Sequence, residues 1–144
     1  MATKPNPAGF STKHVLGIPE IDEQHETIFS LLDRIGNISA HGYRPLDDDE
    51  VDRLLDVLTE LRESALTHFG TEEAFMQELD YPVLEAHATA HEHFLDDLTR
   101  LEGELMNGSA IPPVTMRGFL AEWYGEHILD MDKPLGDFYK KNSK

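Results

Sequence analysis

Four stretches of the chain carry apolar residues at alternating three- and four-residue steps, and each stripe is interrupted by histidine. This spacing places the stripe on one face of an α-helix, as in the seam of a helical bundle. The stripes are Ile21, His25, Ile28, Leu32, Ile35; Val51, Leu54, Leu58, Leu61, Ala65, His68, Glu72, Phe75; Leu84, His87, His91, Phe94, Leu98, Leu101, Leu105; and Met116, Leu120, Trp123, His127. The pattern predicts an all-α, up-down-up-down four-helix bundle.

Breaker residues set the expected bounds of these helices. In chain order they are Pro19 at the first start, His41-Gly42 at the first end, Asp47 to Asp49 as the second cap, Pro82 and Pro112-Pro113 before the third and fourth helices, and Pro134 at the fourth end. An N-terminal extended segment and a short amphipathic C-terminal helix are expected outside the bundle. With no internal repeat or long linker, residues 1–144 are predicted to form a single domain with its core at about 15–135.

The charge balance excludes several classes of partner. Twenty-eight acidic residues against twelve basic ones give a formal net charge of −16, which repels nucleic acid and anionic lipid surfaces. No run approaches the roughly 18 apolar residues of a membrane span, and the start lacks the apolar core of a signal peptide. We expect a cytoplasmic protein with neither nucleic acid nor membrane as a partner.

The chain contains no cysteine and eight histidines. The absence of cysteine excludes disulfides, thiolate zinc sites and iron–sulfur clusters, so any metal must be held by nitrogen and oxygen ligands. His14, His41 and His93 lie off the four stripes and are not assigned to metal. The other five histidines lie on the stripes.

The stripe histidines form chelating pairs. A spacing of four residues puts His68 and Glu72 on one helix face, and His87 and His91 on another. Burying such groups without partners would cost about 1–3 kcal/mol each, a cost that a metal offsets by accepting their lone pairs. Since the helices alternate in direction, all four stripes bring these groups to the same end of the bundle.

Five histidines with added carboxylates exceed the needs of one ion, so the sequence predicts two metals. Imidazole and carboxylate without thiolate suit iron, zinc, copper or manganese. One ligand stays open at this point. Asp132 lies five residues after His127, about 140° from it round a regular helix, whereas Asp130 lies three residues after it and closer to the stripe. Helical spacing therefore favours Asp130.

The motifs together resemble the hemerythrin family, particularly its bacterial single-domain type. They are Ile21-Asp22-Glu23-Gln24-His25, His68-Phe69 through Glu72-Glu73 to Met76, His87-x3-His91, and Trp123-x3-His127-Ile128 with Asp132. The resemblance covers about residues 15 to 135, in order.

The resemblance implies a ligand set for two iron ions. It assigns His87, His91 and His127 to one iron and His25 and His68 to the other, with Glu72, Asp132 and a solvent-derived hydroxide or oxide as bridges. The family pattern His-x4-Asp thus selects Asp132 over Asp130. The second iron keeps an open position, where oxygen binds in this family. An apolar pocket over that position is expected from Ile28, Phe69, Trp123 and Ile128.

The expected function is reversible binding of molecular oxygen, for storage, delivery or sensing, without enzymatic turnover. The alternatives are a di-iron enzyme, such as a peroxidase or an oxygen- or nitric-oxide-detoxifying protein, and an iron-handling protein. Ferritin-like di-iron enzymes use about four carboxylates and Glu-x-x-His pairs, which the proposed ligand set lacks. An oxygen-consuming enzyme is an expected partner, and a monomer is the expected state.

Overall fold

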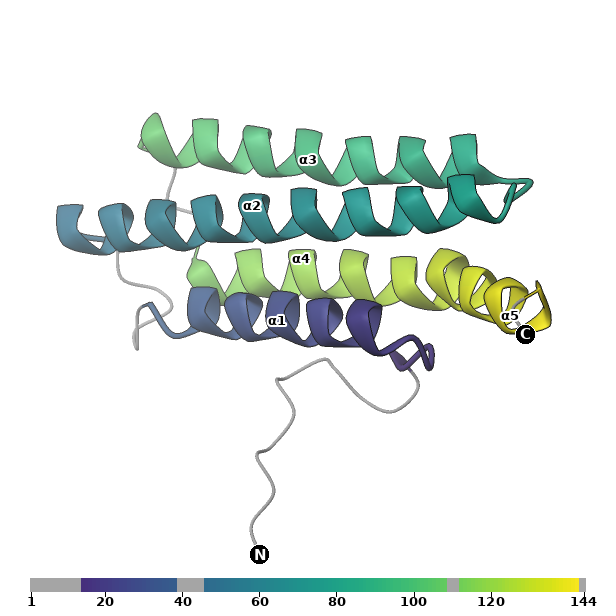
Figure 1. The fold of residues 1–144 in the computed structure, drawn as a ribbon. Helices are drawn as coiled ribbons and strands as arrows, with labels where there is room; N and C mark the ends of the chain where they lie inside the picture. Colours follow the sequence, from purple (N-terminus) through teal and green to yellow (C-terminus); the bar gives the residue numbers. More distant parts are fainter. Residues whose placement is uncertain (1–13, 39–45, 109–111, 143–144) are drawn as a thin grey trace, which may run out of the picture.

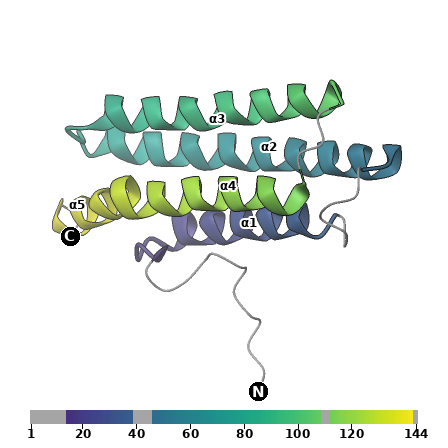
Figure 2. The same cartoon turned by 180° about the vertical axis from the view of Figure 1, so that it is seen from behind.

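The computed structural model describes residues 14–38, 46–108 and 112–142. Its elements are α1 (Pro19–Gly36), α2 (Asp48–Glu78), α3 (Leu84–Met106), α4 (Pro113–His127), the π-helical turn η2 (Ile128–Asp132) and α5 (Lys133–Asn142). The described residues contain no strand. Helices α1 to α4 lie side by side and alternate in direction (Figures 1 and 2). The predicted four-helix bundle is confirmed.

The bundle is held together by the predicted apolar stripes. Helix α1 packs against α2 and α4, and α2 also packs against α3. All five stripe positions of α1 are buried, and so are the α3 positions from His87 to Leu105. The spacing of three and four residues therefore predicts which face each of these helices buries.

Helix α4 differs from the prediction by one residue in its inward face. Tyr124 is fully buried, whereas Trp123 is only partly buried and packs against the edge of the core. The inward positions Met116, Leu120, Tyr124 and His127 keep the same three- and four-residue steps. Periodicity permits either Trp123 or Tyr124 after Leu120, and the structure selects the tyrosine.

Local polar contacts fix where the helices begin. At α2, the Asp47 carboxylate accepts from the Glu50 amide at 2.8 Å, and the Glu50 carboxylate accepts from the Asp47 amide at 3.0 Å. Before α1, Asp22 accepts from the Leu16 and Gly17 amides at 2.7 and 2.9 Å. Gly17 has a φ of 88°, which favours glycine there.

Two predicted helix ends are wrong. Helix α1 ends at Gly36, before His41-Gly42, which lie outside the described residues. Glycine is a weak helix former, and Asn37 follows it as the C-cap. Pro134 does not end the helical backbone: it lies in the first turn of α5, which follows directly on the π-helical turn η2.

The C-terminal helix is present as predicted. The N-terminal extended segment falls largely on residues 1–13, outside the described part. None of the described helices is long and apolar enough to cross a membrane.

Replacing Asp47 with alanine should lower the free energy of unfolding by about 1 kcal/mol, because it removes the side-chain oxygen that accepts from the Glu50 amide. Urea unfolding of the metal-free protein measures this. Asp49→Ala is the matched control, since Asp49 is exposed in the same first turn, and its loss should be smaller. Equal losses would show that the cap adds nothing beyond charge near the helix end.

Candidate metal centre

Seven polar side chains from α1, α2, α3, α4 and η2 form one buried layer near one end of the bundle. Each has at most 5% of its surface exposed: His25, His68, Glu72, His87, His91, His127 and Asp132. These are the seven residues that sequence analysis assigned to metal. The alternating helix directions bring them together from the beginnings of α1 and α3 and the later parts of α2 and α4.

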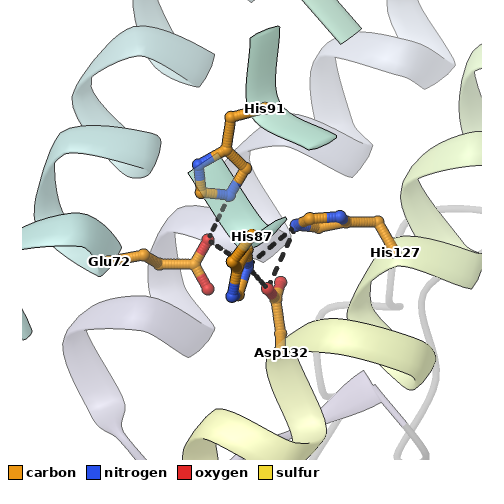
Figure 3. Close-up of side chains that lie close together, drawn as sticks. All are labelled: Glu72, His87, His91, His127 and Asp132. Atoms are coloured by element: carbon orange, nitrogen blue, oxygen red, sulfur yellow. Dashed lines mark hydrogen bonds and ion pairs between the residues drawn. The ribbon is translucent and has the colours of Figure 1, made fainter. Parts of the chain in front are cut away.

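One group of five donors lies at the α2, α3 and α4 side of the layer. It comprises Glu72, His87, His91, His127 and Asp132, which point toward one another (Figure 3). Asp132 Oδ1 lies 2.8 Å from His87 Nε2 and 3.1 Å from His127 Nε2. Glu72 Oε1 lies 3.3 Å from His91 Nε2. Neighbouring ligands about 2.1 Å from an octahedral ion are separated by about 3 Å, which these distances match.

A second group of four donors adjoins the first and shares both carboxylates with it. It comprises His25, His68, Glu72 and Asp132. His25 Nε2 lies 3.0 Å from Asp132 Oδ2, and His68 Nε2 lies 3.1 Å from Glu72 Oε1. The two oxygens of Asp132 therefore face different groups. A carboxylate placed in this way can bridge two metal ions.

Several donor atoms in the layer have no hydrogen-bond partner among the described residues. They are His25 Nδ1 and Nε2, His68 Nε2, Glu72 Oε1 and Oε2, His87 Nδ1, His91 Nε2 and Asp132 Oδ2. Buried polar atoms of this kind normally have partners. Most of them belong to the convergent groups, in which the ligand atoms lie within 4.8 Å of one another. The donor set fits two cations.

His68 and His91 are held in the neutral form that binds metal. Burial lowers the pKa of His91 to about 2, and the neighbouring His127 and His87 add to the shift. Burial, followed by the charge of His25, also holds the pKa of His68 well below its usual value. Neutral imidazoles offer a lone pair to a cation without first losing a proton.

The two carboxylates shift in opposite directions. Burial, and then the charge of Asp132, raises the pKa of Glu72. Burial alone would also raise the pKa of Asp132, but the neighbouring imidazoles, His127 first and then His25 and His87, bring it well below its usual value. Without a cation, the layer thus favours one ionised carboxylate over two.

The π-helical turn η2 explains why Asp132 joins the layer and Asp130 does not. The Lys133 amide bonds to the Ile128 carbonyl, an i→i+5 bond that widens the turn. The wider turn carries Asp132 back to the face of His127, where it is fully buried, while Asp130 is exposed. The spacing argument for Asp130 assumes a regular α-helix, and the structure departs from one at this point.

Two polar residues outside the layer orient its histidines. His68 Nδ1 lies 2.8 Å from the Gln24 side-chain oxygen, and His91 Nδ1 lies 2.9 Å from Glu73 Oε2. Each oxygen accepts the Nδ1 proton and leaves Nε2 as the metal-facing lone pair. Gln24 and Glu73 stand in the sequence motifs, but no role was predicted for them. Their places next to His25 and Glu72 in the sequence could have indicated one.

Aromatic and aliphatic side chains enclose the layer. Phe69 stacks on His91 with ring centroids 3.9 Å apart, and Trp123 stacks on His127 at 4.9 Å. Ile28 and Ile128 are fully buried in the adjoining core. The predicted pocket residues thus lie in the core around the layer, with Trp123 at its outer side.

Tyr124 is a polar neighbour that sequence analysis missed. It is fully buried, and its ring lies 6.0 Å from that of His25 and 6.1 Å from that of His68. Burial, and then the charges of Glu72 and Asp132, raises the pKa of its hydroxyl. Its place three residues before His127 was the available signal.

The remaining histidines take no part in the two groups. His14 is buried and its ring packs 5.6 Å from that of Phe29, and His93 is exposed. His41 lies outside the described residues.

Known proteins similar to this chain share one fold and one family. The family described as "Hemerythrin HHE cation binding domain" matches residues 16–138. A bacteriohemerythrin of Clostridium acetobutylicum is 28% identical over 127 residues, covering 85% of this chain and 93% of the relative. A bacteriohemerythrin of Methylococcus capsulatus is 28% identical over 115 residues, covering 80% and 82%.

The solved structure of wild-type hemerythrin has a TM-score of 0.72 at 24% identity, covering 95% of this chain and 97% of that one. At that identity the likeness shows the shared fold. The family match includes both groups of buried donors and extends over most of the sequence. The chain therefore belongs to the hemerythrin family of cation-binding domains.

Proposed function

We propose that this protein binds molecular oxygen reversibly at a pair of iron ions held in the buried layer. The observation that carries the proposal is the pair of adjoining donor groups that share Glu72 and Asp132. Two separate mononuclear sites would not share both carboxylates. A shared pair would hold two cations side by side, an arrangement in which each ion can supply one of the two electrons that oxygen takes up.

The donor types and the family together support iron. Five imidazoles and two carboxylates without thiolate are compatible with iron, as they are with zinc, copper or manganese, and membership of the hemerythrin family favours iron among these. A solvent oxygen shared by both ions would complete an octahedral set in the larger group. The smaller group would remain one donor short, which leaves an open position beside His25 and His68.

Residues of the chain hold the two ions together, orient the imidazoles and exclude water from that position. Glu72 and Asp132 hold the pair together, while Gln24 and Glu73 fix the imidazole orientations. When bound, the iron pair supplies the two electrons that oxygen takes up and returns. Buried Ile28, Ile128 and Phe69 keep water and anions away from the layer.

The ligand set favours oxygen carriage over oxygen activation. Neutral imidazoles stabilise high oxidation states of iron less than carboxylates do, and the proposed set contains no Glu-x-x-His pair. We assign the protein to oxygen storage or delivery in the cytoplasm, where an oxygen-consuming enzyme would be its partner. A di-iron enzyme or an iron-handling protein is the alternative that the experiments below exclude or establish.

The iron-loaded protein should contain about two iron atoms per chain, measured by elemental analysis after anaerobic reconstitution. Asp132→Asn should lower this value, because it weakens a bridge between the two groups. Asp130→Asn is the matched control, and it should keep the full iron content, since Asp130 is exposed. A wild-type content near one metal, or equal losses in both variants, would contradict the paired site.

Replacing Glu73 with alanine should weaken iron binding by about tenfold to a hundredfold, because His91 loses the acceptor that fixes its orientation. Competition with a chelator of known affinity measures the change. Glu78→Ala, on an exposed position of the same helix, removes the same charge away from the layer and should have little effect. Equal weakening in both variants would assign the effect to overall charge.

Oxygen exposure of the reduced iron protein should change its visible spectrum, and removal of oxygen should restore the original one. Ile128→Ser should speed irreversible oxidation, because a polar residue in the buried core admits water. The neighbouring Leu129→Ser is the matched control, since Leu129 is 37% exposed. Absorbance measures the oxidation rate of each serine variant, and the iron content of each is determined in parallel.

Irreversible oxidation of the wild-type protein on first exposure would count against carriage. Turnover of peroxide at about 1 per second or faster would establish the enzyme alternative. Equal oxidation rates in the two serine variants would show that Ile128 serves only as core.

A further inference from the structure

Tyr124 carries a buried hydroxyl that no described residue satisfies. The residue is fully buried on the inward face of α4, and its oxygen has no hydrogen-bond partner in the described part of the chain. A buried hydroxyl normally has a partner, because burial removes the water it would otherwise bind. A phenylalanine would fill the same space without that penalty. The hydroxyl therefore needs an explanation beyond packing.

The ring of Tyr124 is surrounded by aromatic core residues and by histidines of the layer. The rings of Phe29, Phe69 and Phe94 lie 5.9, 6.3 and 5.4 Å from that of Tyr124, and none of them offers a strong acceptor. The rings of His25, His68 and His127 lie 6.0, 6.1 and 6.3 Å from it. Burial, and then the charges of Glu72 and Asp132, raises the pKa of the hydroxyl. Its polar neighbours are thus those of the metal centre.

The two layer histidines whose rings lie nearest that of Tyr124 belong to the group with the incomplete donor set. The group that contains His25 and His68 has four donors, whereas the adjoining group has five. If each group holds one ion, the ion beside His25 and His68 keeps a place for a molecule from outside the protein. Tyr124 is one member of the hydrophobic cluster around that place that carries a hydroxyl able to donate to such a molecule.

We propose that the Tyr124 hydroxyl donates a hydrogen bond to the exogenous ligand, dioxygen or a small anion, at the open position beside His25 and His68. This inference rests on the proposed function, because it needs the iron pair to create that position. Tyr124 then contributes to ligand affinity and selectivity while the protein ligands hold the metal.

Azide titration of the oxidised, iron-loaded protein tests the proposal, with azide as a small anionic probe. Tyr124→Phe removes only the hydroxyl and should weaken azide binding about tenfold or more, as expected for a lost hydrogen bond to a charged acceptor. Tyr139→Phe is the matched control. It removes a hydroxyl from a ring that packs on Phe75 in α2, away from the layer, and should leave azide affinity unchanged.

Two further measurements separate a hydrogen bond from a packing effect. The infrared stretching frequency of bound azide should shift in Tyr124→Phe and stay constant in Tyr139→Phe. Thermal unfolding of the metal-free protein should show that Tyr124→Phe is as stable as wild type or more stable, since the hydroxyl has no protein partner to lose.

Unchanged or tighter azide binding in Tyr124→Phe, with an unshifted frequency, would overturn the proposal and leave the iron pair in place. A clear loss of stability in metal-free Tyr124→Phe would also overturn it, by showing that the hydroxyl has a structural partner. A wild-type protein that takes up no iron pair would overturn the proposed function and this inference together.

Discussion

The structure depends on one constraint: five histidines and two carboxylates are buried together in one layer. Their donor atoms converge, and several have no partner in the described part of the chain. Each unpaired group opposes folding by about 1–3 kcal/mol, so a cation that pairs with many of them at once stabilises the folded state. Metal binding and the ordering of this end of the bundle are thus linked.

The backbone departs from regular α-helical geometry at Ile128–Asp132, the turn that brings Asp132 into the layer. A continuous α-helix from His127 would turn Asp132 away from the layer and leave Asp130 closer to it. The π-helical turn η2 widens the backbone by an i→i+5 bond and returns Asp132 to the buried face. It also lets α5 continue the chain, so that Leu135 joins the core that covers this end of the bundle. One irregular turn thereby completes the carboxylate pair.

Periodicity alone could predict the four stripes and the layer of histidines, because both follow from three- and four-residue steps. It could not predict Asp132, whose position depends on a π-helical turn; the family resemblance selected that residue. It also could not decide between Trp123 and Tyr124, which fit the inward stripe equally well. The roles of Gln24 and Glu73 depend on contacts between helices, which cannot be predicted from residue spacing within one helix.

The charge around the proposed metal pair is negative, both in the layer and over the chain as a whole. Two carboxylates would neutralise a pair of divalent cations only in part, and Glu73 on His91 supplies further negative charge. The acidic chain, with its net charge of −16, adds a field that favours cation uptake. A fixed cationic side chain beside the open position would oppose that uptake and hold anions there. A neutral phenol at Tyr124 can donate one hydrogen bond to a ligand there without adding a charge that opposes cation uptake.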